Sequence, residues 1–373
     1  MNIGIDALWY YDGYSSLNRV TFNLVNALLD RDTNNDFVIF LDRRFQNQHF
    51  PFSGKRIKLR YLKTGSLRYN FFLKQVVFPY FTFYDKIDIL ITQYYPSPFV
   101  RKSSASFVYD VLFETYPRLF TKREKFQLWP QRFLTRLADF IITISESEKQ
   151  RLLQYGYSKR PDNITVFHLA PDIRFKPLNE FDHHFVSKVK KKFSLPSQYL
   201  LYVGLLSGRK NLDNLLLALP GIDSSIPLVI AGDQHPSYPS NHKAIIKEKS
   251  LETRVMFTGF VDDEELSIIY AHAHIFCFPS LAEGFGLPPL EALACGVPVV
   301  ASNRTSIPEI CGDAAVYFDP ERPDDIAEKI NLILADQKLY EQKKAEALRQ
   351  AKKFNWGESA TRLLSFLNKH KCG

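Results

Sequence analysis

The sequence lacks several features that would assign a protein to a class at once. No apolar run reaches the roughly 18 residues that a membrane-spanning helix needs, and residues 1–14 lack the charged start and apolar run of a signal peptide. We find no internal repeat and no low-complexity segment. The chain also contains neither G-x-G-x-x-G nor a P-loop, which argues against dinucleotide-binding and Walker-type proteins.

Metal-ligand spacing is also missing among the few cysteines. Three of the four cysteines lie near apolar runs, so we interpret them as buried thiols in a reducing, cytoplasmic compartment. His272 and His274 flank one residue at a strand start, a position more typical of core or edge histidines than of ligands. We therefore expect no bound metal and no cofactor. The cysteines are Cys277, Cys295, Cys311 and Cys372.

Length and charge indicate two domains with different partners. A chain of 373 residues suits two domains of ordinary size. Lysine and arginine clearly exceed the acids over residues 1–180, whereas the remainder is close to neutral. The first half is therefore expected to meet something acidic, and we expect no nucleic-acid partner.

Continuous apolar runs alternate with helical patterns along both halves. Continuous runs are typical of strands buried on both faces, and alternation with helices predicts doubly wound parallel sheets, an α/β fold. Predicted strands cover 3–8, 37–41, 57–62, 87–92, 107–109, 140–144, 164–169, 199–204, 228–232, 255–260, 273–278, 297–301 and 316–318. Predicted helices cover 19–29, 126–138 and 358–369, and others begin near Asn211, Asp262, Pro288 and Pro323.

A proline-containing segment without periodicity, APDIRFKPLNE at 170–180, separates the halves. We place the first Rossmann-like domain at 1–175 and the second at 176–355. A final helix at 356–373 is expected to pack back towards the first domain. Ligands of such folds lie outside the carboxyl ends of the strands, so we expect two domains that face a central cleft.

Residues 278–300 carry the most informative local pattern, FPSLAEGFGLPPLEALACGVPVV. A strand end leads through a glycine loop into a helix, whose first N–H groups favour an anion such as phosphate. Glu283 lies in the loop, and Glu291 is placed in the first helical turn. Carboxylates accept hydrogen bonds from hydroxyl groups, so the pattern suits a nucleotide-sugar, although an ordinary loop with Glu291 as a dipole partner explains it too.

Other strand ends carry candidate groups, each with a plain alternative. Arg209 and Lys210 follow a predicted strand and suit a diphosphate, or form a solvated turn. Asp110 is placed to position an acceptor hydroxyl or a sugar, or to cap a turn. The loop at 10–18, before the first helix, is as consistent with a plain turn as with a binding loop. The acids at 262–265 match the first turn of a helix better than a metal site.

An aromatic-rich stretch with scattered cations covers residues 66–86. Together with the cations at 55–60 it is typical of a surface that contacts anionic lipid. A helix that packs its aromatic side chains on the sheet is the other interpretation.

An ordered set of motifs resembles glycosyltransferase family 4 of the GT-B fold, close to bacterial mannosyltransferases of surface polysaccharide synthesis. The resemblance covers nearly the whole chain and is strongest over 199–319. The matching motifs are YVGLLSGRKNLDNLL, VMFTGFVDDEEL, PSLAEGFGLPPLEALACGVPVVAS, SIPEICGDAAVYFDP and FNWGESATRLL.

The resemblance implies roles for individual residues. The E-x7-E pair would place Glu291 at the donor ribose and Glu283 at the donor sugar, and Arg209 and Lys210 would hold the diphosphate. Asp110 is counted among the catalytic residues, with Glu283, Arg209 and Lys210. The other donor-binding residues implied are Gly204, Phe260, Val261, Gly284, Phe285, Gly286 and Leu287. The acceptor side would include Gly13, Ser16, Asn18, Arg19, Tyr109 and Asp110.

Two positions depart from the family pattern. Relatives often carry a glycine-rich loop, G-I-G-R-Y, where this chain has Ser16-Leu17-Asn18-Arg19-Val20. They often carry His-Asp where this chain has Tyr109-Asp110. Tyrosine forms hydrogen bonds but is not a near-neutral acid or base.

The resemblance implies a retaining, metal-independent hexosyltransferase, with GDP-mannose as the first expected donor and a UDP-sugar the second. The expected acceptor is a glycan or a polyprenyl-linked glycan, and the expected location is cytoplasmic, peripheral on the membrane face. A nucleotide-sugar epimerase and a non-catalytic nucleotide-binding partner of a transferase stay open as alternatives.

Overall fold

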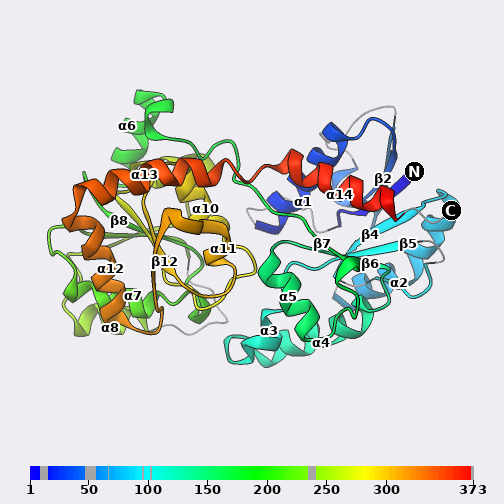
Figure 1. Ribbon diagram of the computed structural model, residues 1–373, viewed down its shortest axis with the longest axis horizontal. Helices are drawn as coiled ribbons and strands as arrows, with labels where there is room; N and C mark the ends of the chain where they lie inside the picture. Colours follow the sequence, from blue (N-terminus) through cyan, green and yellow to red (C-terminus); the bar gives the residue numbers. More distant parts are fainter. Residues whose placement is uncertain are drawn as a thin grey trace. The chain divides into compact units, whose positions relative to one another are not determined.

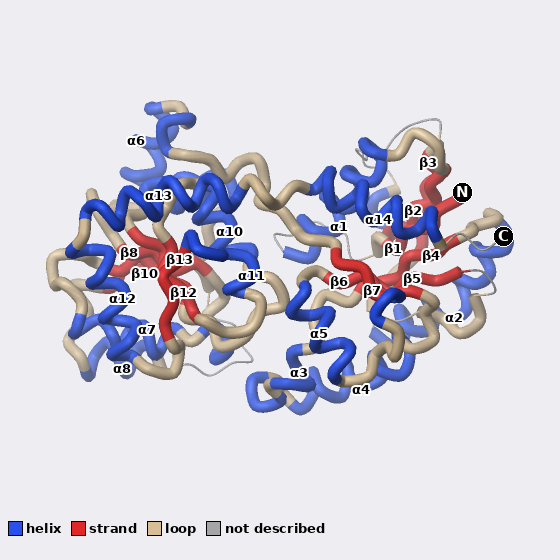
Figure 2. Tube along the Cα trace, in the orientation of Figure 1, coloured by secondary structure: helices blue, strands red, loops and turns tan. Residues whose placement is uncertain are grey.

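The computed structural model describes residues 1–8, 16–46, 56–65, 67–94, 96–100, 103–233 and 241–370, with side chains at 16–18 and 67–71 outside the description. The chain forms two compact units (Figures 1 and 2). One comprises Met1–Leu169 together with Asn355–Gly373, and the other comprises Ala170–Phe354. These limits lie within a few residues of the boundaries placed at 175 and 355 from the sequence.

The first unit is built on a seven-stranded parallel sheet of order β3-β2-β1-β4-β5-β6-β7. Its strands are β1 (Asn2–Asp6), β2 (Asp36–Asp42), β3 (Ile57–Leu62), β4 (Ile89–Gln93), β5 (Ser103–Phe107), β6 (Phe140–Thr143) and β7 (Ile164–Val166). Its helices are α1 (Ser16–Arg31), α2 (Leu67–Tyr84), α3 (Leu112–Thr115), α4 (Lys122–Thr135), α5 (Glu146–Gln154) and α14 (Trp356–Lys369).

Helices cover both faces of this sheet. The strand register turns Val38, Leu90 and Ile141 to one face, where α2, α4 and α5 pack. The final helix α14 packs beside α1 on the other face (Figure 1). There the ring centroids of Phe366 and Phe140 lie 5.4 Å apart. The last helix of the chain thus completes the core of the first unit.

The second unit has a six-stranded parallel sheet of order β10-β9-β8-β11-β12-β13. Its strands are β8 (Leu200–Val203), β9 (Leu228–Ala231), β10 (Val255–Gly259), β11 (Ile275–Phe278), β12 (Val299–Ser302) and β13 (Ala315–Phe318). Its helices are α6 (His183–Lys192), α7 (Leu212–Ala218), α8 (His242–Glu248), α9 (Asp263–His272), α10 (Leu287–Ala294), α11 (Ile307–Cys311), α12 (Pro323–Ala335) and α13 (Gln337–Ala351).

The predicted pair of doubly wound parallel sheets is confirmed, with one strand misplaced. The sequence predicted a strand at 107–109, but β5 is the small-residue segment Ser103–Phe107. All five residues of β5 are buried between β4 and β6, where pairing rather than side-chain hydrophobicity sets the conformation. No described helix has the length and apolar character needed to cross a bilayer.

Candidate active site

The site in the second unit is built where β11 ends and α10 begins. Gly286 adopts a φ of 113° immediately before the helix, a conformation that side chains disfavour. Two prolines follow in the first turn, where their missing N–H groups cost nothing. The turn therefore directs the chain from the sheet edge into α10, where Leu290 N already donates to the Gly286 carbonyl at 3.3 Å.

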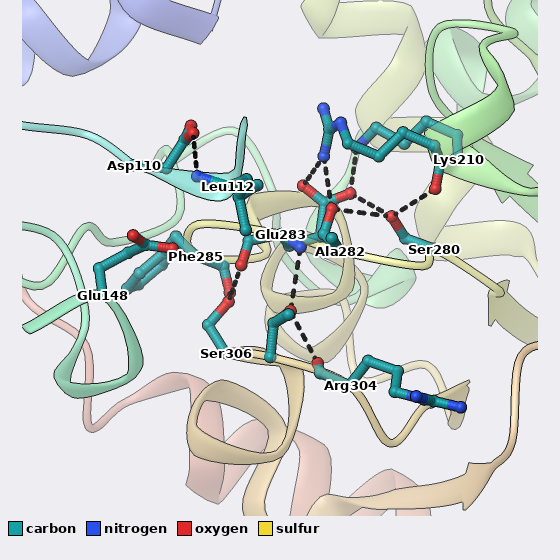
Figure 3. A network of polar contacts seen from close by, with 12 residues as sticks. Asp110, Leu112, Glu148, Lys210, Ser280, Ala282, Glu283, Phe285, Arg304 and Ser306 are labelled. Atoms are coloured by element: carbon teal, nitrogen blue, oxygen red, sulfur yellow. Dashed lines mark hydrogen bonds and ion pairs between the residues drawn. The ribbon is translucent and has the colours of Figure 1, made fainter. Parts of the chain in front are cut away.

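Glu283 lies in this loop and pairs with two cations from another strand end (Figure 3). Its Oε2 is 2.9 Å from the Arg209 guanidinium, and its Oε1 is 2.7 Å from Lys210 Nζ. The Ser280 hydroxyl donates to the same Oε1 at 2.5 Å. Only 9% of the Glu283 side chain is exposed, so a carboxylate and two cations form a largely dehydrated cluster.

The loop after β8 and the loop after β11 are joined directly. Arg209 donates to the Ala282 carbonyl at 2.6 Å, and its own carbonyl accepts from Leu281 N at 2.9 Å. Asn211, in the left-handed region with φ 56°, donates from Nδ2 to the carbonyls of Pro279 and Pro320. These bonds fix the cations relative to the carboxylate.

Burial and charge act in opposite directions on the cluster. Burial alone raises the pKa of Glu283, but Arg209 and Lys210 outweigh it and hold that pKa at about 2. Burial also lowers the pKa of Lys210, and Glu283 partly offsets the effect. Glu283 is therefore an ionised carboxylate, unsuited to donating a proton near neutral pH.

Two hydroxyl residues hold the backbone of the Glu283 loop. Thr305 Oγ1 accepts from Glu283 N at 3.0 Å, and the Ser306 hydroxyl lies 2.9 Å from the Glu283 carbonyl and 2.7 Å from the Phe285 carbonyl (Figure 3). Sequence reasoning missed both residues and also Ser280. The available signal was the position of Thr305 and Ser306 just after β12, the next strand end of the same sheet edge.

Glycines let the neighbouring strand ends meet backbone to backbone. Gly204 N donates to the Ala231 carbonyl at 3.0 Å, and Gly232 has φ 143°. A Cβ at Gly232 would lie 2.1 Å from the Gly204 carbonyl oxygen. Gly204, a predicted donor-binding residue, thus has a packing role at this edge.

The helical acid is placed differently from the prediction. Because α10 begins at Leu287, Glu291 lies in the second turn and not in the first. Its side chain is 3% exposed. Of the two adjacent residues predicted to bind the donor after β10, Phe260 is 54% exposed and Val261 is buried. Gly284 and Phe285 lie in the loop between Glu283 and Gly286.

The acidic run after β10 caps a helix, as the sequence favoured. Asp262 accepts from Glu265 N at 2.9 Å, and Asp263 and Glu265 pair with Arg174 and Lys192. Among the described residues, no group of three or more histidine, cysteine or acidic side chains converges in a way that could hold a metal ion.

The histidines and cysteines have structural positions. His272 stacks on Tyr199 and His274 on Tyr340, and burial lowers the pKa of both. Cys277, Cys295 and Cys311 are free buried thiols whose pKa values burial raises. Cys372 lies outside the described residues.

The candidate residues of the first unit follow β5. Asp110 accepts from Leu112 N at 3.2 Å, within the turn that leads into α3. Tyr109 is buried against Phe107, with ring centroids 4.8 Å apart, and burial raises its pKa. Glu148, also buried, accepts from Val111 N at 3.1 Å and forms an ion pair with Arg151. Sequence reasoning missed this carboxylate, which holds the backbone next to Asp110.

The predicted N-terminal loop is described only in part. Gly13 lies outside the described residues, and so do the side chains of Ser16 and Asn18. The backbone of α1 begins at Ser16, and Arg19 is half-buried.

Residues 186–353 match the profile of the family described as glycosyl transferases group 1. Serotype-specific mannosyltransferase WbdA of Escherichia coli is 33% identical over 60% of this chain and 28% of its own length. O-antigen chain mannosyltransferase B of Escherichia coli is also 33% identical, over 61% of this chain and 60% of its own. The matches thus span less than two thirds of these relatives.

Solved structures resemble the whole chain. Sucrose-phosphate synthase from Thermosynechococcus elongatus superposes with a TM-score of 0.78 at 19% identity, over 99% of this chain and 98% of that one. Anabaena Alr3699/HepE in complex with UDP gives a TM-score of 0.74 at 18% identity, over 99% of both chains. The fold is that of the GT-B glycosyltransferases. Within it, residues 186–353 are the part that is similar to the glycosyl transferases group 1 family.

Proposed function

We propose that the chain transfers a hexosyl group from a nucleoside-diphosphate sugar to a glycan or polyprenyl-linked glycan in cell-surface polysaccharide synthesis. The observation that carries the proposal is the cluster of Glu283, Arg209 and Lys210 at the carboxyl edge of a parallel sheet. Such an edge is where doubly wound folds bind ligands. The similarity to the group 1 family and the mannosyltransferase relatives support the transferase class.

The cluster suits the charge that develops during transfer. When the bond between the anomeric carbon and the phosphate oxygen breaks, the electron pair stays on the departing diphosphate. Arg209 and Lys210 supply fixed positive charge for that anion, and stabilising a developing charge is a large part of catalysis. Ionised Glu283 is proposed to accept hydrogen bonds from the donor sugar, and Glu291 from the ribose.

Retention of anomeric configuration and independence of divalent metal are further parts of the proposal, from the family resemblance. In a retaining transfer the acceptor hydroxyl oxygen attacks on the face from which the diphosphate leaves, and its proton passes to the departing phosphate oxygen. Mannose is the first sugar proposed, with GDP-mannose as donor, because the sequence relatives are mannosyltransferases. A UDP-sugar is second, because HepE, a protein of this fold, was solved with UDP.

The donor is tested first by thermal unfolding with GDP, UDP, ADP and dTDP, each with Mg²⁺ and with EDTA. A ligand at 100 times its dissociation constant adds about 2.7 kcal/mol of stability. We expect one base to be preferred and its shift to survive EDTA. Lys210→Met should abolish the nucleotide-induced shift of the unfolding midpoint, measured from the variant's own midpoint. Lys329→Met removes a cation that is paired on α12 and should keep the shift.

The transfer step is tested with the preferred donor and a panel of glycan acceptors. Loss of transfer in Glu283→Gln with nucleotide binding intact is the expected result, and full activity would overturn the role of Glu283. An isomerised donor sugar without acceptor would indicate an epimerase. Nucleotide binding with no turnover across the panel would instead favour a non-catalytic partner of a transferase.

A further inference from the structure

Helix α4 turns a row of large apolar side chains to solvent. Phe126, Trp129 and Phe133 are 79%, 63% and 53% exposed, and Leu137 just beyond the helix is 50% exposed. Their spacing of three or four residues puts them on one side of the helix. The ring centroids of Trp129 and Phe133 lie 5.4 Å apart, so these two side chains pack against each other.

The opposite side of α4 is firmly held. Leu128 packs against the core cluster that contains Ile141, and Gln131 and Thr135 are buried. A capping box between Thr121 and Glu124 fixes the N-terminus of the helix. The exposed row is therefore a fixed feature of the surface.

Helix α2 adds a second exposed row on the same side of the sheet. Its inner side packs Leu73 and Phe78 on the core, as one interpretation of residues 66–86 required. Its outer side carries Phe72, Val76, Tyr80, Phe83 and Tyr84, all about half-exposed or more. Helices α2 and α4 cover the same face of the sheet (Figure 1), so both exposed rows belong to that side of the unit.

Positive charge surrounds the α4 row. Residues 118–136 contain six lysines and arginines and a single acid, Glu124, which is engaged in the capping box. Next to α2, by contrast, Lys58 and Arg60 both pair with Asp85, so that side is less positive than the sequence suggested. The excess charge is concentrated along α4.

A pocket of about 400 Å³ lies at the end of α4 and is lined by Arg136, Lys159 and Arg160. Ile141 and Tyr157, from the core beneath α4, also line it, so it lies on the same side of the unit. Arg136 Nε donates to the Gly156 carbonyl at 2.5 Å. Asp139 is the acid in the pocket, and it accepts from Ser104 N.

We propose that α4, with the outer row of α2 and this pocket, docks the protein on a bilayer that contains anionic phospholipid. Aromatic side chains enter the headgroup region, cations along α4 meet lipid phosphates, and the pocket receives a headgroup phosphate. A second copy of the chain fits this face less well, because two such surfaces would bring like charges together. The proposal does not depend on transferase activity.

Vesicle co-sedimentation of the full chain tests the proposal. Vesicles of phosphatidylcholine alone are compared with vesicles containing about a third phosphatidylglycerol, in low and high salt. We expect binding to the anionic vesicles only, weakened by salt. Phe126→Ser/Trp129→Ser/Phe133→Ser, and separately Arg136→Gln/Lys159→Gln/Arg160→Gln, should each lower affinity about tenfold or more.

Controls separate lost docking from lost folding. Ile173→Ser changes an apolar side chain that is 92% exposed in the other unit and should bind as the unchanged protein does. All variants should keep the thermal midpoint of the unchanged protein. If the α4 triple variant has a lower midpoint, the single variant Trp129→Ser replaces it in the binding test. With Trp9→Phe/Trp356→Phe, the remaining Trp129 should shift its emission to the blue and be quenched by brominated lipid.

Three results would overturn the proposal. One is that the protein binds the two kinds of vesicle equally or binds neither. Another is that the α4 variants bind anionic vesicles as well as the unchanged protein does. The third is a protein that does not bind vesicles but forms a concentration-dependent dimer, which the α4 triple variant no longer forms. The exposed face of α4 would then be a subunit interface. Transfer activity is scored separately with a water-soluble acceptor, so each proposal fails by its own measurement.

Discussion

At the scale of single residues, Glu283 connects most of the contacts at the candidate site. It pairs with Arg209 and Lys210, accepts from Ser280, and has its backbone held by Thr305 and Ser306. Removing one partner of a buried ion pair leaves an uncompensated charge, which is costly. The residue is therefore expected to matter for stability as well as for transfer.

Glu283→Gln should lower the free energy of unfolding of the second unit by about 3 kcal/mol at pH 7, because two cations lose their carboxylate. Glu321→Gln removes an exposed partner of Arg304 in the same unit and should change it by less than about 0.5 kcal/mol. Urea unfolding followed by circular dichroism measures both. Equal stability of the two variants would contradict the expectation.

The stability difference between the unchanged protein and Glu283→Gln should depend on pH. The folded-state pKa of Glu283 is depressed to about 2 from an ordinary 4.5. A depressed carboxyl pKa stabilises the fold above the unfolded value and stops doing so as pH falls through the folded one. The difference should be constant above about pH 5 and shrink between about pH 4.5 and 2. A difference that grows on acidification would show that the carboxyl is not held ionised.

At the scale of elements, the turns that follow the strands of the second unit determine where side chains gather. Asn211, Gly232 and Gly286 have positive φ values at three such turns, after β8, β9 and β11. Each turn ends a buried strand at the same edge of the sheet. At Gly232 the backbone lies so close to the Gly204 carbonyl that no side chain fits there.

Gly232→Ala should destabilise the second unit by at least about 2–3 kcal/mol, because its Cβ would overlap the Gly204 carbonyl and its φ disfavours a side chain. Gly208→Ala is the matched control, since no atom lies within 4 Å of its added Cβ. Scanning calorimetry compares the two. A tolerated Gly232→Ala would mean that β8 and β9 separate easily at this end.

At the scale of the whole molecule, the chain leaves the first unit at Leu169 and returns to it at Asn355. The returning helix α14 buries Leu363 and Leu367 and packs beside α1. The core of the first unit is thus completed only when the last residues have been made. All three tryptophans, Trp9, Trp129 and Trp356, belong to this unit, so their fluorescence reports on it alone.

Leu367→Ala should lower the stability of the first unit by about 2–5 kcal/mol, because Leu367 is fully buried. Tryptophan fluorescence during urea unfolding measures the change. Leu332→Ala, at a half-exposed position on α12 of the other unit, should leave that transition in place. An unchanged transition in Leu367→Ala would show that α14 contributes little to the core.

The sequence by itself determined the two parallel sheets and the loop that carries Glu283. Continuous apolar runs and the glycines and prolines around α10 are local signals, and local signals can be read along the chain. The strand β5 was misplaced because its residues, SSASF, are small and mostly polar. Its conformation comes from burial between two neighbouring strands.

Only the tertiary structure decided which side chains meet. The crossovers of a parallel sheet bring strand ends far apart in sequence to one edge, which is how Lys210 and Glu283 form an ion pair. The same holds for Ser306, whose position after β12 could be read from the sequence but whose contacts with the Glu283 and Phe285 carbonyls could not. Which side of α4 faces outward was likewise decided by packing, because its apolar residues occur on both sides and only those against Ile141 find a core.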